Sequence, residues 1–342
     1  MAKPKQRRVT VSDVAKAAGV ARATAAFALS GTASRVGLSQ TTVERIETIA
    51  KAMNYVPNKV ARSLIASRSE VVGVLLAGLW GKYAQIVVEG IREVLDKNCY
   101  VPMMTIHSWD EEREKRELDL LLQMRVDAMI VQPQPSSRSE TYRAVVANNV
   151  PLIFLGDVPD DMPRAHAVVW DGNQAAQLGM EHLVAKGRKR IGFIGQQYPF
   201  QYNQARFKGY RDFIQKRKLP QNSRWEIWEG MQGGLSDGMD KLFRSRKNLP
   251  DAFLAMNDTC GLEAAEWLLN HGIRIPEDVA IVGLGDYSET AEFNAFLTSV
   301  REPLHEIGRN AAEVALQLIE HSPKKPMRRI LSGRELVQRR ST

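Results

Sequence analysis

Residues 9–29 read VTVSDVAKAAGVARATAAFAL, and this stretch decides the fold of the N-terminal part of the chain. Thr10 precedes a run of small apolar residues and Asp13 stands three positions later, which predicts a helix that opens with a capping box. Gly19 predicts the end of this helix. A second helix is expected over residues 21–29, and two short helices joined by a glycine-containing turn are typical of a helix-turn-helix motif.

A third helix is predicted after Ser39, where apolar residues recur every three or four positions as far as Met53. This helix closes a small three-helix core with the first two. Pro57 ends the helical pattern, and Asn58 can cap a further short helix. Because a helix of about eight residues is marginal alone in water, we expect this hinge helix to form only when another molecule, such as DNA, stabilises it.

Positive charge is concentrated in the first 68 residues. They hold twelve lysines and arginines against three acidic residues, a net charge of +9, so the rest of the chain carries −1 of the total of +8. A short basic segment on a near-neutral body is typical of a polyanion-binding module. A solvated basic tail would show the same charge, but the helix pattern within this segment favours DNA binding.

From residue 71 onwards, predicted strands alternate with predicted helices. This rhythm predicts parallel sheets covered by helices on both faces. It restarts after Trp170, so we expect two lobes with one sheet each. The last helix, over residues 304–321, carries a plain apolar stripe that indicates core packing. Strands are expected near residues 71–77, 100–106, 128–131, 151–155, 190–195, 252–256 and 279–283.

Motifs of enzymes and of metal sites are missing from the sequence. The six histidines are scattered, and there is no phosphate-binding loop, nucleophile elbow or dinucleotide fingerprint. Cys99 and Cys260, the two cysteines, have no metal-ligand spacing and favour a reducing compartment. No apolar run reaches the length of a membrane span, and no apolar signal core follows the basic N-terminus. We therefore expect a cytoplasmic, nucleoid-associated protein with no catalytic residues, no metal, no cofactor and no membrane partner.

From residue 9 to residue 64 the chain resembles the lactose-repressor (LacI/GalR) family of transcriptional regulators, and the resemblance extends over essentially the whole chain. It is carried by Asp13-Val14-Ala15, Ala18-Gly19-Val20, Thr24 and Asn54-Tyr55-Val56-Pro57-Asn58. It implies an α/β fold with an N-terminal three-helix helix-turn-helix domain and a hinge helix. A two-lobed sensor with parallel sheets, similar to periplasmic binding proteins, would follow. A free-standing solute receptor with that sensor is disfavoured, because it would need a secretion signal and no helix-turn-helix.

The implied domains are residues 1–56 for DNA binding, 57–68 for the hinge helix and linker, and 69–342 for effector binding and dimerisation. Three crossovers, near residues 169–170, 297–300 and 329–331, would divide the sensor. Lobe 1 would hold about residues 69–169 and 301–328, and lobe 2 about residues 170–299 and 330–342. Such a sensor binds its ligand between the lobes, at the carboxyl ends of the strands.

By the same resemblance, Arg22, Ala23 and Phe27 occupy the base-reading positions of the second helix, and Thr24 a phosphate-contacting one. In the hinge, Leu64 would wedge into the minor groove beside the Leu64 of a second copy. Four neighbouring residues would contact phosphates or groove edges: Asn58, Lys59, Ala61 and Arg62.

Two residues of the second helix depart from the family pattern. Ala21 stands where the family usually has serine, which removes a helix cap worth about 1 kcal/mol. Phe27 cannot form a bidentate contact with guanine, so it would touch a thymine methyl group or a sugar. The alternative is that Phe27 packs into the small core. We expect an unusual operator in the first case.

Arg206 matches the arginine with which the family binds its ligands, and a guanidinium can clamp hydroxyl groups or a carboxylate. Asp171 would orient it, and Asp258 either binds ligand or caps a helix. Gly285 stands where sugar-responsive members have aspartate. The loss of that carboxylate would make the pocket more cationic, which favours an acid sugar over a neutral sugar or a purine. The implied effector-binding residues are Tyr83, Asp171, Arg206, Asn257, Asp258 and Asp286.

These interpretations predict a homodimeric repressor on a pseudo-palindromic stretch of double-stranded operator DNA. A dimer is expected because one recognition helix reads too few base pairs for useful specificity. Closure of the lobes on a small-molecule effector would change the spacing of the hinge helices and so the affinity for the operator. The sequence leaves open whether the effector releases DNA or strengthens its binding.

Overall fold

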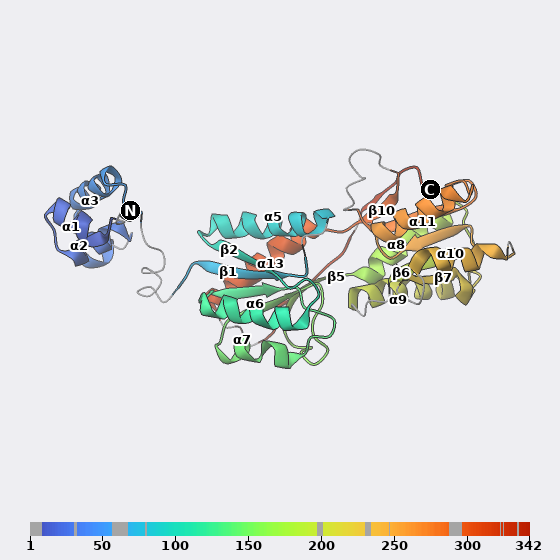
Figure 1. Cartoon of the computed structure of the whole chain (residues 1–342), viewed down its shortest axis with the longest axis horizontal. Coiled ribbons are helices and arrows are strands. Elements are labelled where there is room, and N and C mark those ends of the chain that lie inside the picture. The colour runs from blue at the N-terminus through green and yellow to red at the C-terminus, as the bar shows by residue number, and fades with distance from the viewer. Residues whose placement is uncertain are drawn as a thin grey trace, which may run out of the picture. The chain divides into compact units, whose positions relative to one another are not determined.

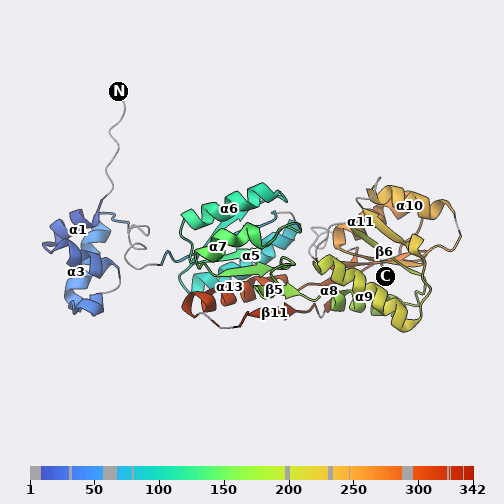
Figure 2. The same cartoon turned by 90° about the horizontal axis from the view of Figure 1, so that it is seen from below.

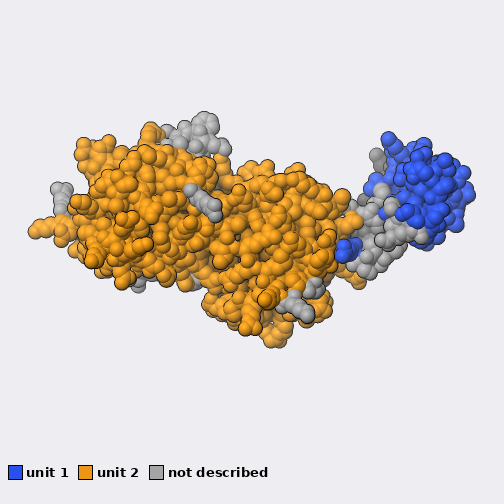
Figure 3. Space-filling view, turned by 180° about the vertical axis from the view of Figure 1, so that it is seen from behind, with its two compact units in different colours: residues 1–69 blue, residues 70–342 orange. Residues whose placement is uncertain are grey.

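The computed structural model describes residues 9–30, 33–56, 68–78, 81–196, 201–229, 234–245, 247–286, 296–321, 323, 325–333 and 335–342. The chain forms two compact units, Met1–Ser69 and Glu70–Thr342, which we call unit 1 and unit 2 (Figure 3). No helix among the described residues is long and apolar enough to cross a membrane.

Unit 1 contains the predicted three helices, α1 (Val11–Ala18), α2 (Arg22–Leu29) and α3 (Gln40–Ala52), with a 3-10 turn η1 (Ala33–Val36) before α3 (Figure 1). The expected capping box opens α1: the Asp13 carboxylate accepts the Thr10 backbone N–H at 2.8 Å, and the Thr10 hydroxyl accepts the Asp13 N–H at 3.4 Å. Gly19 ends α1 with a φ of 65°. The helices enclose a small core of buried residues: Val14, Ala15, Ala18, Ala25, Ala28, Ile46 and Ala50.

Lobe 1 of unit 2 is built on a six-stranded sheet in the order β11-β5-β4-β3-β1-β2, in which all pairs are parallel. Helices α5 and α13 cover one face of this sheet, and α6 and α7 cover the other (Figure 2). The strands are β1 (Val71–Leu76), β2 (Val101–Ile106), β3 (Ala128–Val131), β4 (Leu152–Leu155), β5 (His166–Trp170) and β11 (Arg328–Leu331). The helices are α5 (Gly81–Lys97), α6 (Glu111–Gln123), η2 (Ser139–Tyr142), α7 (Arg143–Ala147) and α13 (Leu304–Glu320).

Lobe 2 repeats this plan with the strand order β12-β10-β9-β8-β6-β7, in which only β12 is antiparallel to its neighbour among the described strands. Helices α8 and α9 pack on one face, and α10 and α11 on the other. The strands are β6 (Ile191–Gln196), β7 (Glu226–Glu229), β8 (Ala252–Ala255), β9 (Ala280–Gly285), β10 (Thr298–Arg301) and β12 (Glu335–Val337). The helices are α8 (Gly172–Ala185), α9 (Gln201–Arg217), η3 (Ser223–Trp225), α10 (Gly234–Arg244) and α11 (Asp258–Asn270). The prediction of parallel sheets with helices on both faces is confirmed.

The chain passes between the lobes after β5, after β10 and after β11. The second crossover, at Glu302 and Pro303, lies beyond the expected residues 297–300, because Thr298–Arg301 still pairs with β9 in lobe 2. The third begins at Ser332, because Arg328–Leu331 pairs with β5 in lobe 1. Residue 301 therefore belongs to lobe 2, and the return to lobe 1 starts one residue later.

Candidate functional site

Helix α2 divides into a buried face and an exposed face. Ala25 and Ala28 are buried in the core of unit 1, whereas Arg22 and Ala23 are exposed. Phe27 lies one turn after Ala23 and 38% of its surface is exposed. This exposure excludes the alternative that Phe27 belongs to the core, and it leaves the ring available on the same face as Ala23.

Of the other DNA-binding candidates, the structure describes those on α2 but not those in the hinge. Thr24 is half-buried on α2. Ala21 takes the cap position of α2 and makes no side-chain hydrogen bond there, as its methyl group requires. The hinge candidates Asn58, Lys59, Ala61, Arg62 and Leu64 lie outside the described residues.

Polar side chains stand at the carboxyl ends of five parallel strands of lobe 2. We call them the strand-end cluster: Gln196, Glu229, Asn257, Asp258, Asp286 and Glu302. The Gln196 amide donates to Glu229 Oε2 at 2.8 Å and accepts from Asn257 Nδ2 at 3.2 Å. Strand β6 lies between β7 and β8, so the strand order reverses here, which is where open α/β sheets bind ligands.

Arg206 is the buried cation beneath this cluster. It lies on α9 with 2% of its surface exposed, and its Nη1 donates to the carbonyl of Met256 at 2.7 Å. Its Nη2 forms an ion pair with Glu302, which is equally buried. The guanidinium also lies over the ring of Tyr202, 5.1 Å from the centroid. Arg206 is therefore a buried, ion-paired arginine rather than one of the surface.

The structure corrects two expectations about charge in lobe 2. Asp171 was expected to orient Arg206, but its carboxylate accepts the Gln174 N–H at 3.0 Å and caps α8, while Glu302 holds the guanidinium. The pocket was also expected to be more cationic for lack of a carboxylate at Gly285. Glu302 supplies that carboxylate from the next strand, so the charge of Arg206 is balanced within the chain.

Three further candidates already have partners. Asn257 caps α11 by accepting the Cys260 N–H at 2.8 Å, so the cap is not Asp258, as the alternative had it. Asp258 instead accepts from the Ser299 hydroxyl at 2.5 Å. Asp286 bridges two arginines, Arg301 at 2.7 Å and Arg339 at 2.6 Å.

Aromatic rings from both lobes meet at Trp170. The centroids of Trp170 and Tyr202 are 5.1 Å apart, and those of Trp170 and Tyr83 are 6.1 Å apart. Tyr83 belongs to α5 of lobe 1 and Tyr202 to α9 of lobe 2. The buried indole Nε1 of Trp170 has no hydrogen-bond partner among the described residues. A buried donor without a partner, in an aromatic cluster whose Tyr202 also contacts the Arg206 guanidinium, indicates a group that a ligand can satisfy.

A second inter-lobe contact was missed by the sequence analysis. Asp157, which follows β4 in lobe 1, accepts the backbone N–H groups of Gln201 at 3.1 Å and Tyr202 at 3.3 Å. These residues form the first turn of α9 in lobe 2, so a carboxylate of one lobe caps a helix of the other. Burial raises the pKa of Asp157 from 3.8 to about 7.

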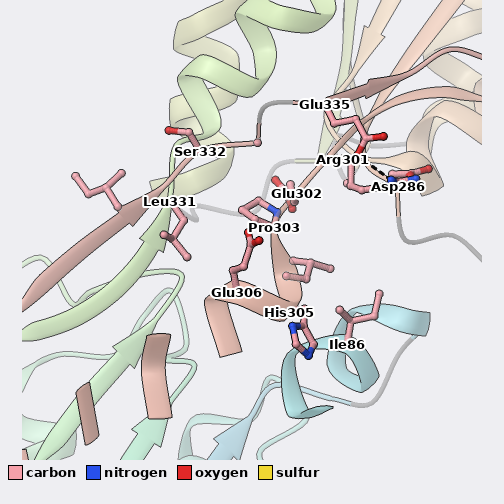
Figure 4. A pocket seen from close by; sticks show the side chains of 14 residues that line it. Ile86, Asp286, Arg301, Glu302, Pro303, His305, Glu306, Leu331, Ser332 and Glu335 are labelled. Atoms are coloured by element: carbon pink, nitrogen blue, oxygen red, sulfur yellow. Dashed lines mark hydrogen bonds and ion pairs between the residues drawn. The ribbon is translucent and has the colours of Figure 1, made fainter. Parts of the chain in front are cut away.

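A cavity of about 660 Å³ opens beside the second and third crossovers (Figure 4). We call it the crossover pocket. Its volume falls in the range of small-molecule sites. Asp286 is the one predicted effector residue that lines it, and Glu302, Arg301 and Glu335 add further charges. No group of three metal-ligating side chains occurs among the described residues.

Comparison with known proteins divides the chain in the same way. Residues 10–58 match the lacI family of bacterial regulatory proteins, and residues 180–342 match a periplasmic binding protein-like domain. The HTH-type transcriptional repressor PurR of Haemophilus influenzae is 26% identical over 316 residues, 91% of each chain. PurR of Aliivibrio salmonicida is 26% identical over 337 residues, 97% of this chain and 98% of the relative.

Solved structures share the fold over nearly the whole length. The Lac repressor dimer bound to operator and the anti-inducer ONPF has a TM-score of 0.83 at 24% identity, covering 98% of this chain and 99% of that one. The transcriptional regulator CelR in complex with cellobiose has a TM-score of 0.70 at 23% identity, covering 98% and 100%.

The curated relatives are transcription regulators rather than enzymes, and they align with both units of the chain. We conclude that the chain is a transcriptional regulator that joins a lacI-family DNA-binding domain to a periplasmic binding protein-like domain.

Proposed function

We propose that this repressor binds a pseudo-palindromic operator as a homodimer and that its effector is an acid sugar bound between the two lobes. It would act in the cytoplasm, on the DNA of the nucleoid. The observation that carries the effector assignment is the buried guanidinium of Arg206 at the strand ends of lobe 2.

The DNA-binding part of the proposal rests on the exposed face of α2. Arg22, Ala23 and Phe27 would read base edges there, and Thr24 would contact phosphate. The excess of positive charge in the first 68 residues would attract the DNA backbone. In the hinge, Leu64 would enter the minor groove as a wedge, with the basic side chains beside it on the phosphates.

Several side chains around Arg206 suit an acid sugar. A guanidinium can pair with a carboxylate through two parallel hydrogen bonds, and Arg206 already forms an ion pair with one carboxylate through its Nη2. Gln196 and Asn257 can exchange hydrogen bonds with sugar hydroxyls. The rings of Trp170 and Tyr202 offer apolar faces to a sugar ring.

A neutral sugar is the second candidate, favoured by a specific observation. The strand-end cluster contains four carboxylates, and carboxylates accept hydrogen bonds from neutral hydroxyl groups. In that case Glu302 would keep its ion pair with Arg206, and the ligand would bind beside two charges that neutralise each other. The relative CelR, solved with cellobiose, is an example of a neutral sugar bound by this fold.

Thermal unfolding of the full-length protein with acid sugars, neutral sugars and purines separates these effector classes. An acid sugar such as D-gluconate should raise the melting temperature. At a hundredfold excess over its Kd, the bound ligand adds about 2.7 kcal/mol to the free energy of unfolding. Arg206→Lys keeps the charge but loses the planar fork, so the shift and the effect on operator binding should both disappear.

The matched control for this test is Arg211→Lys on the same helix. The Arg211 side chain is 57% exposed and pairs with Glu226, away from Arg206. This variant should respond to the effector as the unmodified protein does. If only neutral sugars or purines raise the melting temperature, the acid-sugar assignment is wrong.

A further inference from the structure

A carboxylate of the chain itself already occupies the arginine that the proposed effector would bind. Glu302 and Arg206 form an ion pair in which the side chains are 3% and 2% exposed. The other terminal nitrogen of Arg206 donates to the Met256 carbonyl. An incoming carboxylate that takes the Nη2 position must therefore displace Glu302.

Glu302 is the member of this ion pair that reaches the crossover pocket. It lines the crossover pocket, whereas Arg206 does not (Figure 4). A ligand in this cavity therefore meets the Glu302 carboxylate before it can reach the guanidinium. A neutral ligand can donate hydrogen bonds to the Glu302 carboxylate while the ion pair stays intact. An anionic ligand is repelled by Glu302 and attracted by Arg206.

Glu302 is also a crossover residue. It follows β10 of lobe 2 and precedes Pro303 and α13 of lobe 1. Its backbone N–H donates to the Gly285 carbonyl at 3.2 Å, and its carbonyl accepts the Leu304 N–H at 2.9 Å. Its side chain ties this crossover to α9, so a change of its partner acts directly on a segment that joins the lobes.

We infer that Glu302 is a built-in competitor of the effector carboxylate. The acid takes the place of Glu302 on Arg206, and the displaced side chain releases the crossover between β10 and α13. This inference rests on the proposed acid-sugar effector. Exchange of one carboxylate for another leaves the buried guanidinium paired in both states, and the displaced Glu302 carboxylate turns into the crossover pocket that it already lines, where water solvates it. Two states of similar free energy are what a ligand needs to shift an equilibrium.

The test compares a sugar acid with its neutral counterpart on full-length protein. The ligands are D-gluconate and D-sorbitol, which has a hydroxymethyl group in place of the carboxylate, and Kd is measured by calorimetry. Glu302→Gln removes the competing charge and keeps the shape of the side chain. The variant should bind D-gluconate about tenfold more tightly than the unmodified protein, with the affinity for D-sorbitol unchanged. A merely structural role of Glu302 would alter both affinities together.

Two further variants complete the design. Glu302→Asp keeps the charge on a shorter side chain and decides the question if Glu302→Gln fails to fold; it should strengthen D-gluconate binding to a smaller degree. Glu313→Gln also removes a carboxylate from an arginine ion pair, with Arg329 at 2.6 Å, but on α13 away from the pocket. It should leave both affinities unchanged.

The outcomes separate this inference from the effector assignment. If the unmodified protein binds D-gluconate and the Glu302 variants bind it equally or more weakly, the effector class stands and the competitor role is overturned. If the unmodified protein ignores D-gluconate but Glu302→Gln binds it, the competitor role stands and the effector class fails. Binding by neither protein overturns both.

Discussion

At the scale of single residues, Phe27 is the side chain on the exposed face of α2 from which we predict a base preference of the operator. At the proposed base-reading position an apolar ring would form no hydrogen bond, and its 38% exposure would leave it available to the groove. The one apolar group that base edges present in the major groove is the methyl group of thymine. Phe27 therefore favours a thymine at one position of each half-site.

Replacement of thymine by uracil in the operator tests this contact, because it removes the methyl group alone. With an operator selected from random DNA, one thymine per half-site should show a loss of about fourfold, the worth of about one buried methyl group. The Phe27→Ala variant should show no loss at that position. Equal sensitivity of both proteins, measured by fluorescence anisotropy, would place the ring against a sugar instead.

At the scale of elements, the N-terminus of α9 is held by a group from the other lobe. Asp157 of lobe 1 accepts two N–H groups from the first turn of this helix, and Gln201 adds a side-chain hydrogen bond to the Val158 carbonyl at 2.8 Å. Arg206 lies in the second turn of the same helix. The helix that carries Arg206, the arginine proposed to bind the effector, is thus positioned by both lobes.

The raised pKa of Asp157 makes this contact dependent on pH. A carboxyl group whose pKa is about 7 in the folded chain and about 3.9 in the unfolded chain stabilises the fold while it is protonated. Its contribution to the free energy of unfolding is complete below about pH 4, decreases between pH 4 and pH 7, and is lost above about pH 7. At pH 8 the free energy of unfolding of Asp157→Asn should therefore exceed that of the unmodified protein, by at most about 4 kcal/mol.

Melting temperatures of the two proteins between pH 4 and pH 8 measure this effect. The advantage of Asp157→Asn should grow up to about pH 7 and then level off. Asp119→Asn, which changes an exposed carboxylate on α6 of the same lobe, serves as the control and should show no such trend. If the melting temperatures of Asp157→Asn and the unmodified protein differ by the same amount from pH 4 to pH 8, the pKa of Asp157 is not raised in the folded chain.

At the scale of the whole molecule, one edge of the lobe 1 sheet fits the proposed dimer. Strand β2 ends the sheet and pairs with β1 alone among the described strands. It contains no charged residue, and 46% of Val101 and 39% of Met104 are exposed. An uncharged, apolar edge strand invites pairing with another chain, and a second copy of this one is the partner that a two-fold operator requires.

Charge on this edge should separate the subunits. Val101→Lys would bury an unpaired ammonium group in the dimer and weaken association by about 3 kcal/mol or more. Val146→Lys places the same charge on α7, where 55% of the valine is exposed, and should leave association unchanged. Sedimentation of both variants at micromolar concentration reads out the result. If Val101→Lys still sediments as two chains, the dimer forms through another surface.

The sequence by itself determined the features that depend on near neighbours. The capping box of α1, its end at Gly19 and the start of α3 after Ser39 are set by residues three or four positions apart, so they can be read directly. The two parallel sheets follow from the alternation of strand and helix patterns. Helix α2 and Arg206 were predicted as binding elements because the motifs that contain them are continuous in the chain.

Only the tertiary structure decided which distant groups meet. Arg206 and Glu302 are 96 positions apart, and Asp157 and Gln201 are 44 positions apart, so neither pair leaves a local pattern. The expected cationic pocket was wrong for this reason: a charge can be balanced by any carboxylate that folding brings to the same strand ends. The exposure of Phe27 was decided in the same way, since an aromatic residue in a short helix suits a core or a surface equally until the other helices pack. Local chemistry thus specifies the elements, and the packing of the elements specifies the electrostatics of the site.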